Sequence, residues 1–222
     1  MTHPDTLSAP STVMHWDARL ARRLVAPLRD SWVTPNHLTT VRLTVGLLGA
    51  AAFLPGTYGW ANIAALLVVV SNFLDHADGE LARLGGKSSR MGHLYDLASD
   101  ALVTILTFIA IGIGVGERAS IGLPLAAAGL GLIAGSAIAL IFYLRMRIED
   151  RLGKAGTSQT SFGGFETEDV LYGLPLVTLC DATAPLLIAA SVCAPLFALW
   201  VAADYRRVMH RHQLFTVQSD SG

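Results

Sequence analysis

Four aspartates within a 26-residue stretch are the residues whose spacing points most directly to chemistry. Asp75 and Asp78 are three positions apart, and Asp96 and Asp100 are four apart, in runs that are otherwise apolar. On a helix each pair shares one face, so two adjacent helices would direct four carboxylates into one pocket. Clustered carboxylates repel unless cations join them, and oxygen ligands favour hard ions such as Mg²⁺, Mn²⁺ or Ca²⁺. The spacing therefore predicts a two-metal site.

The residues between the aspartates carry a family resemblance. From Asp75 to Asp100 the chain reads D-x2-D-G-x2-A-R-x8-G-x3-D-x3-D, which resembles the signature of the CDP-alcohol phosphotransferases. The resemblance implies a membrane enzyme of phospholipid biosynthesis. It would transfer a phosphatidyl or similar group from a CDP-alcohol, most simply CDP-diacylglycerol, to the hydroxyl of a small polar alcohol, and it would release CMP.

The resemblance also implies roles for single residues. Asp75, Asp78 and Asp96 would bind two Mg²⁺ or Mn²⁺ ions, and Asp100 would act as the general base and contact a metal as well. A T-P-N-x-x-T-x-x-R segment beginning at Thr34 is similar to one that precedes the signature in relatives. The implied nucleotide-binding residues are Gly79, Ala82, Arg83, Gly92, Asn36 and Thr39.

The acceptor alcohol stays open. A phosphorylated acceptor would need nearby cations, and the candidates on the aspartate side of the chain are Lys87, Arg90, Arg145, Arg147, Arg151 and Lys154. The acidic residues Glu166, Glu168 and Asp169 point instead to an amino-alcohol or serine-like acceptor, or to ion pairs with the basic loop.

Three polar residues near the aspartates have competing interpretations. Arg42 interrupts an apolar run, so its side chain either extends to the membrane surface or contacts a substrate phosphate. His76 is expected in the core or at headgroup level, because imidazole suits a hard-ion site poorly. Glu80 is expected to reach solvent or a basic partner.

Two other protein classes also place aspartates in membranes. A divalent-cation transporter needs them along its pathway, and an intramembrane prenyltransferase uses aspartate-rich motifs to hold a metal-bound diphosphate. A transporter gives no reason for Gly79, Ala82, Arg83 and Gly92 at their spacings. Prenyltransferase motifs are usually of the D-x3-D or D-D-x2-D type on well-separated helices, whereas here a D-x2-D pair and a D-x3-D pair lie close together in the sequence.

Composition predicts an all-α integral membrane protein. Apolar residues make up 52% of the 222 residues, charged residues make up 15%, and the mean hydropathy is +0.49. Apolar runs of near-spanning length predict six transmembrane helices, with the small residues of the fourth suited to close packing in lipid. Their ranges are about 34–54, 60–83, 92–115, 121–145, 169–180 and 185–203.

An amphipathic segment precedes these spans. Between residues 12 and 30, leucines at a spacing of four alternate with arginines, which is typical of a helix lying in the membrane surface. The chain is thus predicted to comprise a tail with this interfacial helix (1–33), a six-helix bundle (34–205) and a cytoplasmic tail (206–222).

The basic residues predict the orientation. Of 16 Lys and Arg residues, only Arg118 falls in a loop on the far side of a six-span bundle. The positive-inside rule then places both termini and the aspartates at the cytoplasmic face of the cell membrane. The short arginine clusters at helix ends do not indicate nucleic-acid binding. The expected partners are the donor lipid, the acceptor and membrane lipid, with a homodimer as a family expectation.

Overall fold

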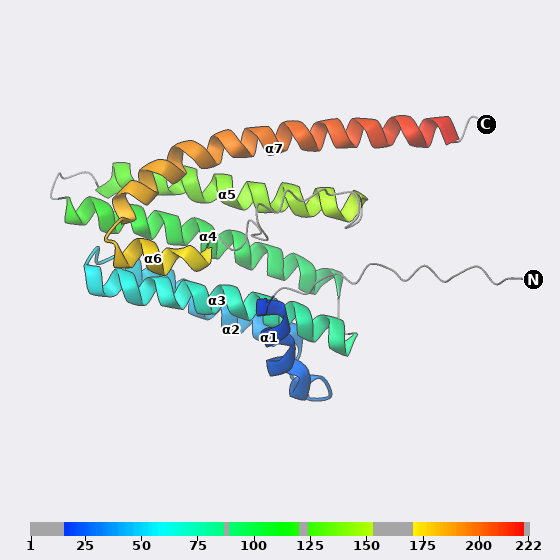
Figure 1. Ribbon diagram of the computed structural model, residues 1–222, viewed down its shortest axis with the longest axis horizontal. Coiled ribbons are helices and arrows are strands. Elements are labelled where there is room, and N and C mark those ends of the chain that lie inside the picture. Colours follow the sequence, from blue (N-terminus) through cyan, green and yellow to red (C-terminus); the bar gives the residue numbers. More distant parts are fainter. Residues whose placement is uncertain (1–15, 87–88, 120–123, 153–170, 220–222) are drawn as a thin grey trace, which may run out of the picture.

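Helices make up every regular element of the residues that the computed structural model describes, which are 16–86, 89–119, 124–152 and 171–219 (Figure 1). In chain order they are α1 (Trp16–Val25), the short 3-10 helix η1 (Ala26–Leu28), α2 (Pro35–Phe53), α3 (Tyr58–Gly85), α4 (Arg90–Arg118), α5 (Pro124–Leu152), α6 (Leu174–Leu179) and α7 (Thr183–Ser219). The all-α prediction is confirmed.

Four helices are long and apolar enough to cross a membrane, namely α3, α4, α5 and α7. The other two predicted spans do not reach that criterion among the described residues. The first half of α2 contains several polar residues and carries Arg42, and the six residues of α6 rise only about 9 Å. The predicted start of the fifth span, at residue 169, lies outside the described residues. The count of six spans stays a prediction.

The long helices run side by side along the bundle (Figure 1). At one end of the bundle α3 is followed by α4, and α1 and the C-terminal end of α7 lie toward this same end. The short helix α6 lies toward the opposite end. Residues 75–100, which carry the aspartates, therefore lie at the end shared with α1.

Two helices extend beyond their predicted ends. α5 continues past residue 145 to Leu152, and α7 continues past residue 203 to Ser219. Neither extension contains Pro or Gly, so nothing in the local sequence stops the helix. The end of an apolar run predicts where a helix leaves the membrane, which is a different point from its last residue.

The N-terminal helix α1 packs against α3. Ala21 and Val25 are buried with Ala77 and Leu81 of α3, while Leu20 and Leu24 are exposed. A helix is thus present within the range predicted for the amphipathic segment, and its inner face packs against the part of α3 that carries the first two aspartates. Its position in a membrane surface stays a prediction.

The α2–α3 seam is a line of residue pairs between these two antiparallel helices. The pairs are Thr39 with Asp78, Arg42 with Asp75, Gly46 with Ser71, and Gly49 with Val68. Their spacing alternates between three and four residues, as in a coiled coil. A Cβ added at Gly46 would lie 2.8 Å from Ser71 Oγ, and Ser71 Oγ donates to the Arg42 carbonyl at 3.0 Å. Glycine therefore lets the two backbones approach closely.

Small residues have the same effect between α4 and α5. A Cβ added at Gly135 would lie 2.8 Å from Ile105 Cα of α4, and one added at Gly131 would collide with the Phe108 carbonyl. The close packing predicted for the fourth span, which is α5, is confirmed.

Candidate metal centre

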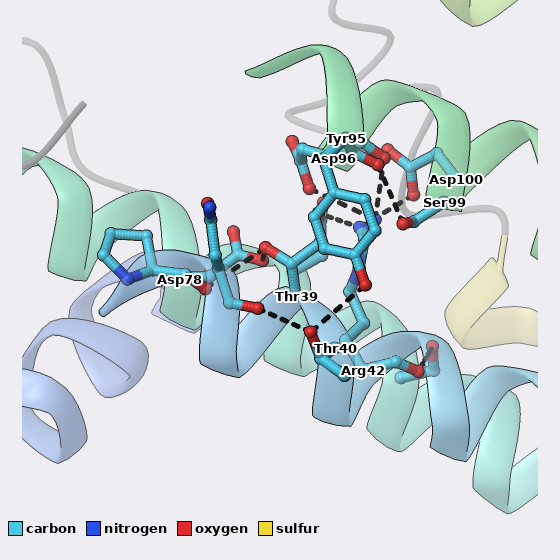
Figure 2. A network of polar contacts seen from close by, with 12 residues as sticks. Thr39, Thr40, Arg42, Asp78, Tyr95, Asp96, Ser99 and Asp100 are labelled. Carbon is cyan, nitrogen blue, oxygen red and sulfur yellow. Dashed lines mark hydrogen bonds and ion pairs between the residues drawn. The ribbon is translucent and has the colours of Figure 1, made fainter. Parts of the chain in front are cut away.

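Three of the four signature aspartates converge between α3 and α4. One carboxylate oxygen each from Asp75, Asp78 and Asp96 lies within 4.8 Å of the other two. Asp100, one turn beyond Asp96, is joined to the group through a shared cation, Arg42 (Figure 2). The spacing rule within each helix predicted this meeting of carboxylates correctly.

The donor set fits a divalent cation. All donors are carboxylate oxygens, which Mg²⁺ and Mn²⁺ prefer. Asp96 Oδ1 is buried and accepts no hydrogen bond within the described part of the chain, although Arg42 Nη2 lies 3.1 Å away as an ion-pair partner. We conclude that the contact is electrostatic and that its angle does not suit a hydrogen bond. A buried oxygen without a donor is unusual, and the cluster can therefore bind a metal through it.

Thr39 holds Asp78 in place. Its hydroxyl donates to Asp78 Oδ2 at 2.7 Å, and the two residues are only 2% and 5% exposed. The same hydroxyl lies 3.2 Å from the Pro35 carbonyl, but its single proton favours the shorter, charged acceptor. Thr39 was predicted to contact the nucleotide, whereas here its hydroxyl is bound to a candidate metal ligand.

Arg42 lies beneath the cluster with its side chain 2% exposed. Its Nη1 atom contacts the Asp75 carboxylate and lies 2.8 Å from Asp100 Oδ1, and its Nη2 atom donates to the Asp96 backbone carbonyl at 3.0 Å. The guanidinium does not extend to the surface, so the first interpretation from the sequence is wrong. Its partners in this structure are the aspartates, and a contact with a substrate phosphate stays a prediction.

The predicted nucleotide residues lie on α2, α3 and α4, the helices that carry Arg42 and the four aspartates. Ser89 caps α4 by accepting from the Gly92 amide at 3.0 Å, and a Cβ added at Gly92 would lie 2.9 Å from Asn36 Oδ1. At Gly79 the nearest atom to an added Cβ is Arg83 Nη2, at 3.7 Å. Packing thus accounts for glycine at position 92, where α2 approaches α4, and gives no reason for glycine at position 79.

Glu80 and Arg83 form an ion pair within α3. Glu80 is 3% exposed, so the expectation that it reaches solvent is wrong and the expectation of a basic partner is correct. The Arg83 side chain is 68% exposed, and Ala82 beside it is half-buried. His76 Nδ1 lies 3.0 Å from the Asn72 carbonyl, as expected for a side chain outside the metal cluster.

Tyr95 of α4 and Thr40 of α2 form a further polar contact near the cluster. The Tyr95 hydroxyl lies 3.1 Å from Thr40 Oγ1, and Ser99 donates to the Tyr95 carbonyl at 2.8 Å (Figure 2). Tyr95 is not among the residues predicted from the sequence. The aspartate partners of Arg42 were not predicted either, although a lone cation in the apolar run ahead of four aspartates needs a counter-ion.

The candidate acceptor residues are only partly described. Arg145 lies 5.4 Å from the centre of the Phe197 ring on α7, and Arg147 lies 5.9 Å from that of Tyr143. Arg90 and Arg151 belong to α4 and α5, but their side chains lie outside the described part of the chain. The remaining residues singled out for the acceptor also lie outside it: Lys87, Lys154, Glu166, Glu168 and Asp169. Their role in acceptor binding stays a prediction.

Comparison with known proteins identifies a family. Residues 32–203 match the model of the CDP-alcohol phosphatidyltransferase family. The chain is 30% identical over 176 residues to a cardiolipin synthase (CMP-forming) from Streptomyces coelicolor, and the match covers 75% of this chain and 74% of that protein.

Two further relatives are longer than the region they share with this chain. The chain is 30% identical over 143 residues to a bifunctional IPC transferase and DIPP synthase from Rubrobacter xylanophilus, which covers 64% of this chain and 30% of that protein. It is 35% identical over 92 residues to an archaetidylinositol phosphate synthase from Pyrococcus horikoshii, which covers 40% of this chain and 47% of that protein. The matched region thus spans less than half of either relative.

Proposed function

Because the chain belongs to the CDP-alcohol phosphatidyltransferase family, we propose that it transfers a substituted phosphate group from CDP-diacylglycerol to the hydroxyl of a small polar alcohol and releases CMP. The observation that carries this proposal is the convergence of Asp75, Asp78 and Asp96 within 4.8 Å. The family assignment also favours this function over the transporter and prenyltransferase alternatives.

We assign Asp75, Asp78, Asp96 and Asp100 as the ligands of two divalent ions, Mg²⁺ or Mn²⁺. Such ions, when bound, supply positive charge that offsets the diphosphate and the developing charge on the leaving CMP. The protein's contribution is the arrangement of the ligands. The Thr39 hydroxyl orients Asp78, and the buried guanidinium below the cluster orients the other three aspartates.

Asp100 is the general base in this proposal. Its side chain is 45% exposed, compared with 25% for Asp75 and 32% for Asp96, and Asp78 is buried. A base must come within hydrogen-bond reach of its proton, and an acceptor hydroxyl reaches the most exposed carboxylate most easily. Asp100 would take the hydroxyl proton while that oxygen bonds to the β-phosphorus and the bond from this phosphorus to the CMP oxygen breaks.

The nucleotide would bind beside the exposed end of α3. The open space at Gly79 supports this placement, because it leaves room for a ligand next to the helix backbone. The exposed guanidinium of Arg83 is positioned to pair with a phosphate oxygen, and half-buried Ala82 leaves space for the base. Gly92 and Asn36, which contact each other, would form the opposite wall.

The orientation in the cell membrane is a further part of the proposal. The end of the bundle that holds the aspartates also holds α1 and the C-terminal end of α7 (Figure 1). This arrangement supports an active site and termini on one side of the membrane. The distribution of basic residues in the sequence supports the cytoplasmic side. A homodimer remains part of the proposal on family grounds alone.

Release of CMP by the purified protein tests the function. The protein in liposomes would receive CDP-diacylglycerol, Mn²⁺ or Mg²⁺, and in turn glycerol 3-phosphate, inositol, inositol phosphate or serine. We expect EDTA-sensitive CMP release with one acceptor, and loss of release in Asp96→Asn, which keeps the side-chain shape. CMP release that persists at full rate in EDTA, or failure to bind CDP-diacylglycerol, would contradict the proposal.

A further inference from the structure

We propose that Arg42 is a built-in counter-cation of the aspartate cluster, which keeps the carboxylates assembled without metal and lowers their affinity for metal. This inference rests on the metal site proposed above. It concerns a residue outside the signature, and it makes Arg42 a positioning residue, since its partners are the candidate ligands.

The contacts of Arg42 reach both helices of the cluster. Its Nη1 atom contacts Asp75 of α3 and lies 2.8 Å from Asp100 Oδ1 of α4, and its Nη2 atom lies 3.1 Å from Asp96 Oδ1. One planar guanidinium thus joins three carboxylates, a geometry that a lysine ammonium on a flexible stem does not reproduce. Without such a cation, the clustered negative charges would push α3 and α4 apart at this end.

The exposure of these side chains shows where a metal would enter. Arg42 is 2% exposed, whereas its partners Asp75, Asp96 and Asp100 are 25%, 32% and 45% exposed. The guanidinium therefore lies on the buried side of the cluster, and the aspartate carboxylates are accessible from the opposite side. A metal ion arriving from the exposed side does not need to displace Arg42, which stays charged at all relevant pH values. The two cations then share ligands and repel each other.

The packing contacts between α2 and α3 near the cluster do not involve the Arg42 side chain. The Arg42 backbone carbonyl accepts from Ser71 Oγ at 3.0 Å, Gly46 packs against the same serine, and Thr39 holds Asp78 at 2.7 Å. These contacts remain when only the side chain at position 42 is shortened. In a variant without the positive charge at position 42, the loss of charge is therefore expected to change metal affinity more than any shift in the positions of the ligands does.

The test is the variant Arg42→Gln in the full-length protein in detergent, with Mn²⁺ alone as the probe. Binding is followed by the electron paramagnetic resonance signal of free Mn²⁺, and the unfolding midpoint is measured in EDTA and in saturating Mn²⁺. A unit charge within a few ångströms of a divalent ion has a large effect at a partly buried site, so we expect Mn²⁺ to bind about tenfold more tightly or better in Arg42→Gln. Its midpoint should fall in EDTA and largely recover in Mn²⁺.

The matched control is Arg118→Gln, which removes another arginine–aspartate pair. Arg118 pairs with Asp181, at the end of α4 remote from the aspartate cluster, so this variant should leave Mn²⁺ affinity unchanged and lower the midpoint equally with and without metal. A merely structural Arg42 would behave in the same way as this control.

The outcomes separate the two proposals. If wild-type protein neither binds Mn²⁺ nor gains thermal stability from it, the metal site fails and this inference fails with it. If the wild type binds Mn²⁺ and Arg42→Gln binds it equally or more weakly, only this inference is overturned. Should Arg42→Gln not fold, Arg42→Lys decides. Lysine keeps the positive charge but lacks the planar guanidinium that joins three carboxylates. The unfolding midpoint of Arg42→Lys in EDTA should therefore be lower than that of the wild type, while its Mn²⁺ affinity should stay within about threefold. A larger change in affinity or an unchanged midpoint would overturn the inference.

Discussion

The variant Thr39→Val tests whether the α2–α3 seam positions a metal ligand. Valine has nearly the shape of threonine, so the change removes the hydroxyl donor and leaves no cavity. The lost hydrogen bond, 2.7 Å long, ends on a carboxylate that is 5% exposed. Hydrogen bonds to charged groups contribute about 1.5–3 kcal/mol, and the buried position of both partners favours the upper part of this range.

The assay is thermal unfolding in EDTA, where no metal can compensate for the missing donor. In proteins of this length each kcal/mol shifts the midpoint by about 2–4 °C, so we expect Thr39→Val to lose about 4–12 °C. Mn²⁺ should also bind more weakly, because Asp78 would no longer be held in one orientation. This loss of affinity is opposite in sign to the gain expected for Arg42→Gln.

The matched control is Thr44→Val on the same helix. Thr44 is exposed and donates to the Thr40 backbone carbonyl at 2.8 Å, so its hydrogen bond has a neutral acceptor within the same helix. Its loss should shift the midpoint by less than about 2 °C and leave Mn²⁺ binding unchanged. If the two variants lose the same stability and bind Mn²⁺ equally, then the Thr39–Asp78 contact does not position a ligand and our reasoning about the seam is wrong.

Three further predictions address other parts of the molecule. Asp100→Asn should abolish CMP release and retain CDP-diacylglycerol binding, and continued turnover would remove Asp100 from the base role. Gly79→Ala should keep or raise the unfolding midpoint, because the added Cβ has no atom closer than 3.7 Å, and it should raise the KM for the donor. The control Gly59→Ala, also in open space, should change neither the KM nor turnover. The Arg118 hydrogen bond lowers the pKa of Asp181, so this pair stabilises the fold above pH about 4 and the stabilisation is lost as the pH falls further. The midpoint difference between wild type and Asp181→Asn should therefore shrink on acidification below pH 4, and a difference that grows would contradict the assignment.

The convergence of the carboxylates could be predicted from the sequence because it follows from rules that operate within one helix. Asp75 and Asp78 share a face of α3 at a spacing of three, and Asp96 and Asp100 share a face of α4 at a spacing of four. The short connection between the helices makes them neighbours. The position of α2 is not needed for this prediction.

The position of Arg42 could not be predicted in the same way, because it depends on the register between two helices. Sliding α2 by one turn against α3 would keep every residue of α2 in a helix and would move Arg42 away from Asp75. The register is set by Gly46 and Ser71, whose contact lies one turn deeper in the seam. Such a fit between surfaces has no signature in the periodicity of either helix alone.

The helix α2 was predicted to be a span but does not meet the criterion for one, for a related reason. Apolar length predicts a span well when charged residues stand at its ends, as for α4 and α5. It works less well for α2, where Thr39 and Arg42 interrupt the first turns because they serve the cluster. The residues of α2 that contact the aspartates are thus the ones that weaken its apolar signal.

The α2–α3 seam joins the specificity of the fold to the chemistry of the site. Within a bilayer, the hydrophobic effect does not drive helices together, so close packing and polar contacts must select the register. Gly46 and Gly49 supply the close packing in the apolar part of the seam, and Thr39 and Arg42 supply the polar contacts at its end. A slip of one turn would leave the buried Asp78 carboxylate and the partly buried Asp75 carboxylate without their α2 partners, which costs more than the loss of any single apolar contact. The aspartates therefore help to select the helix register that brings them together.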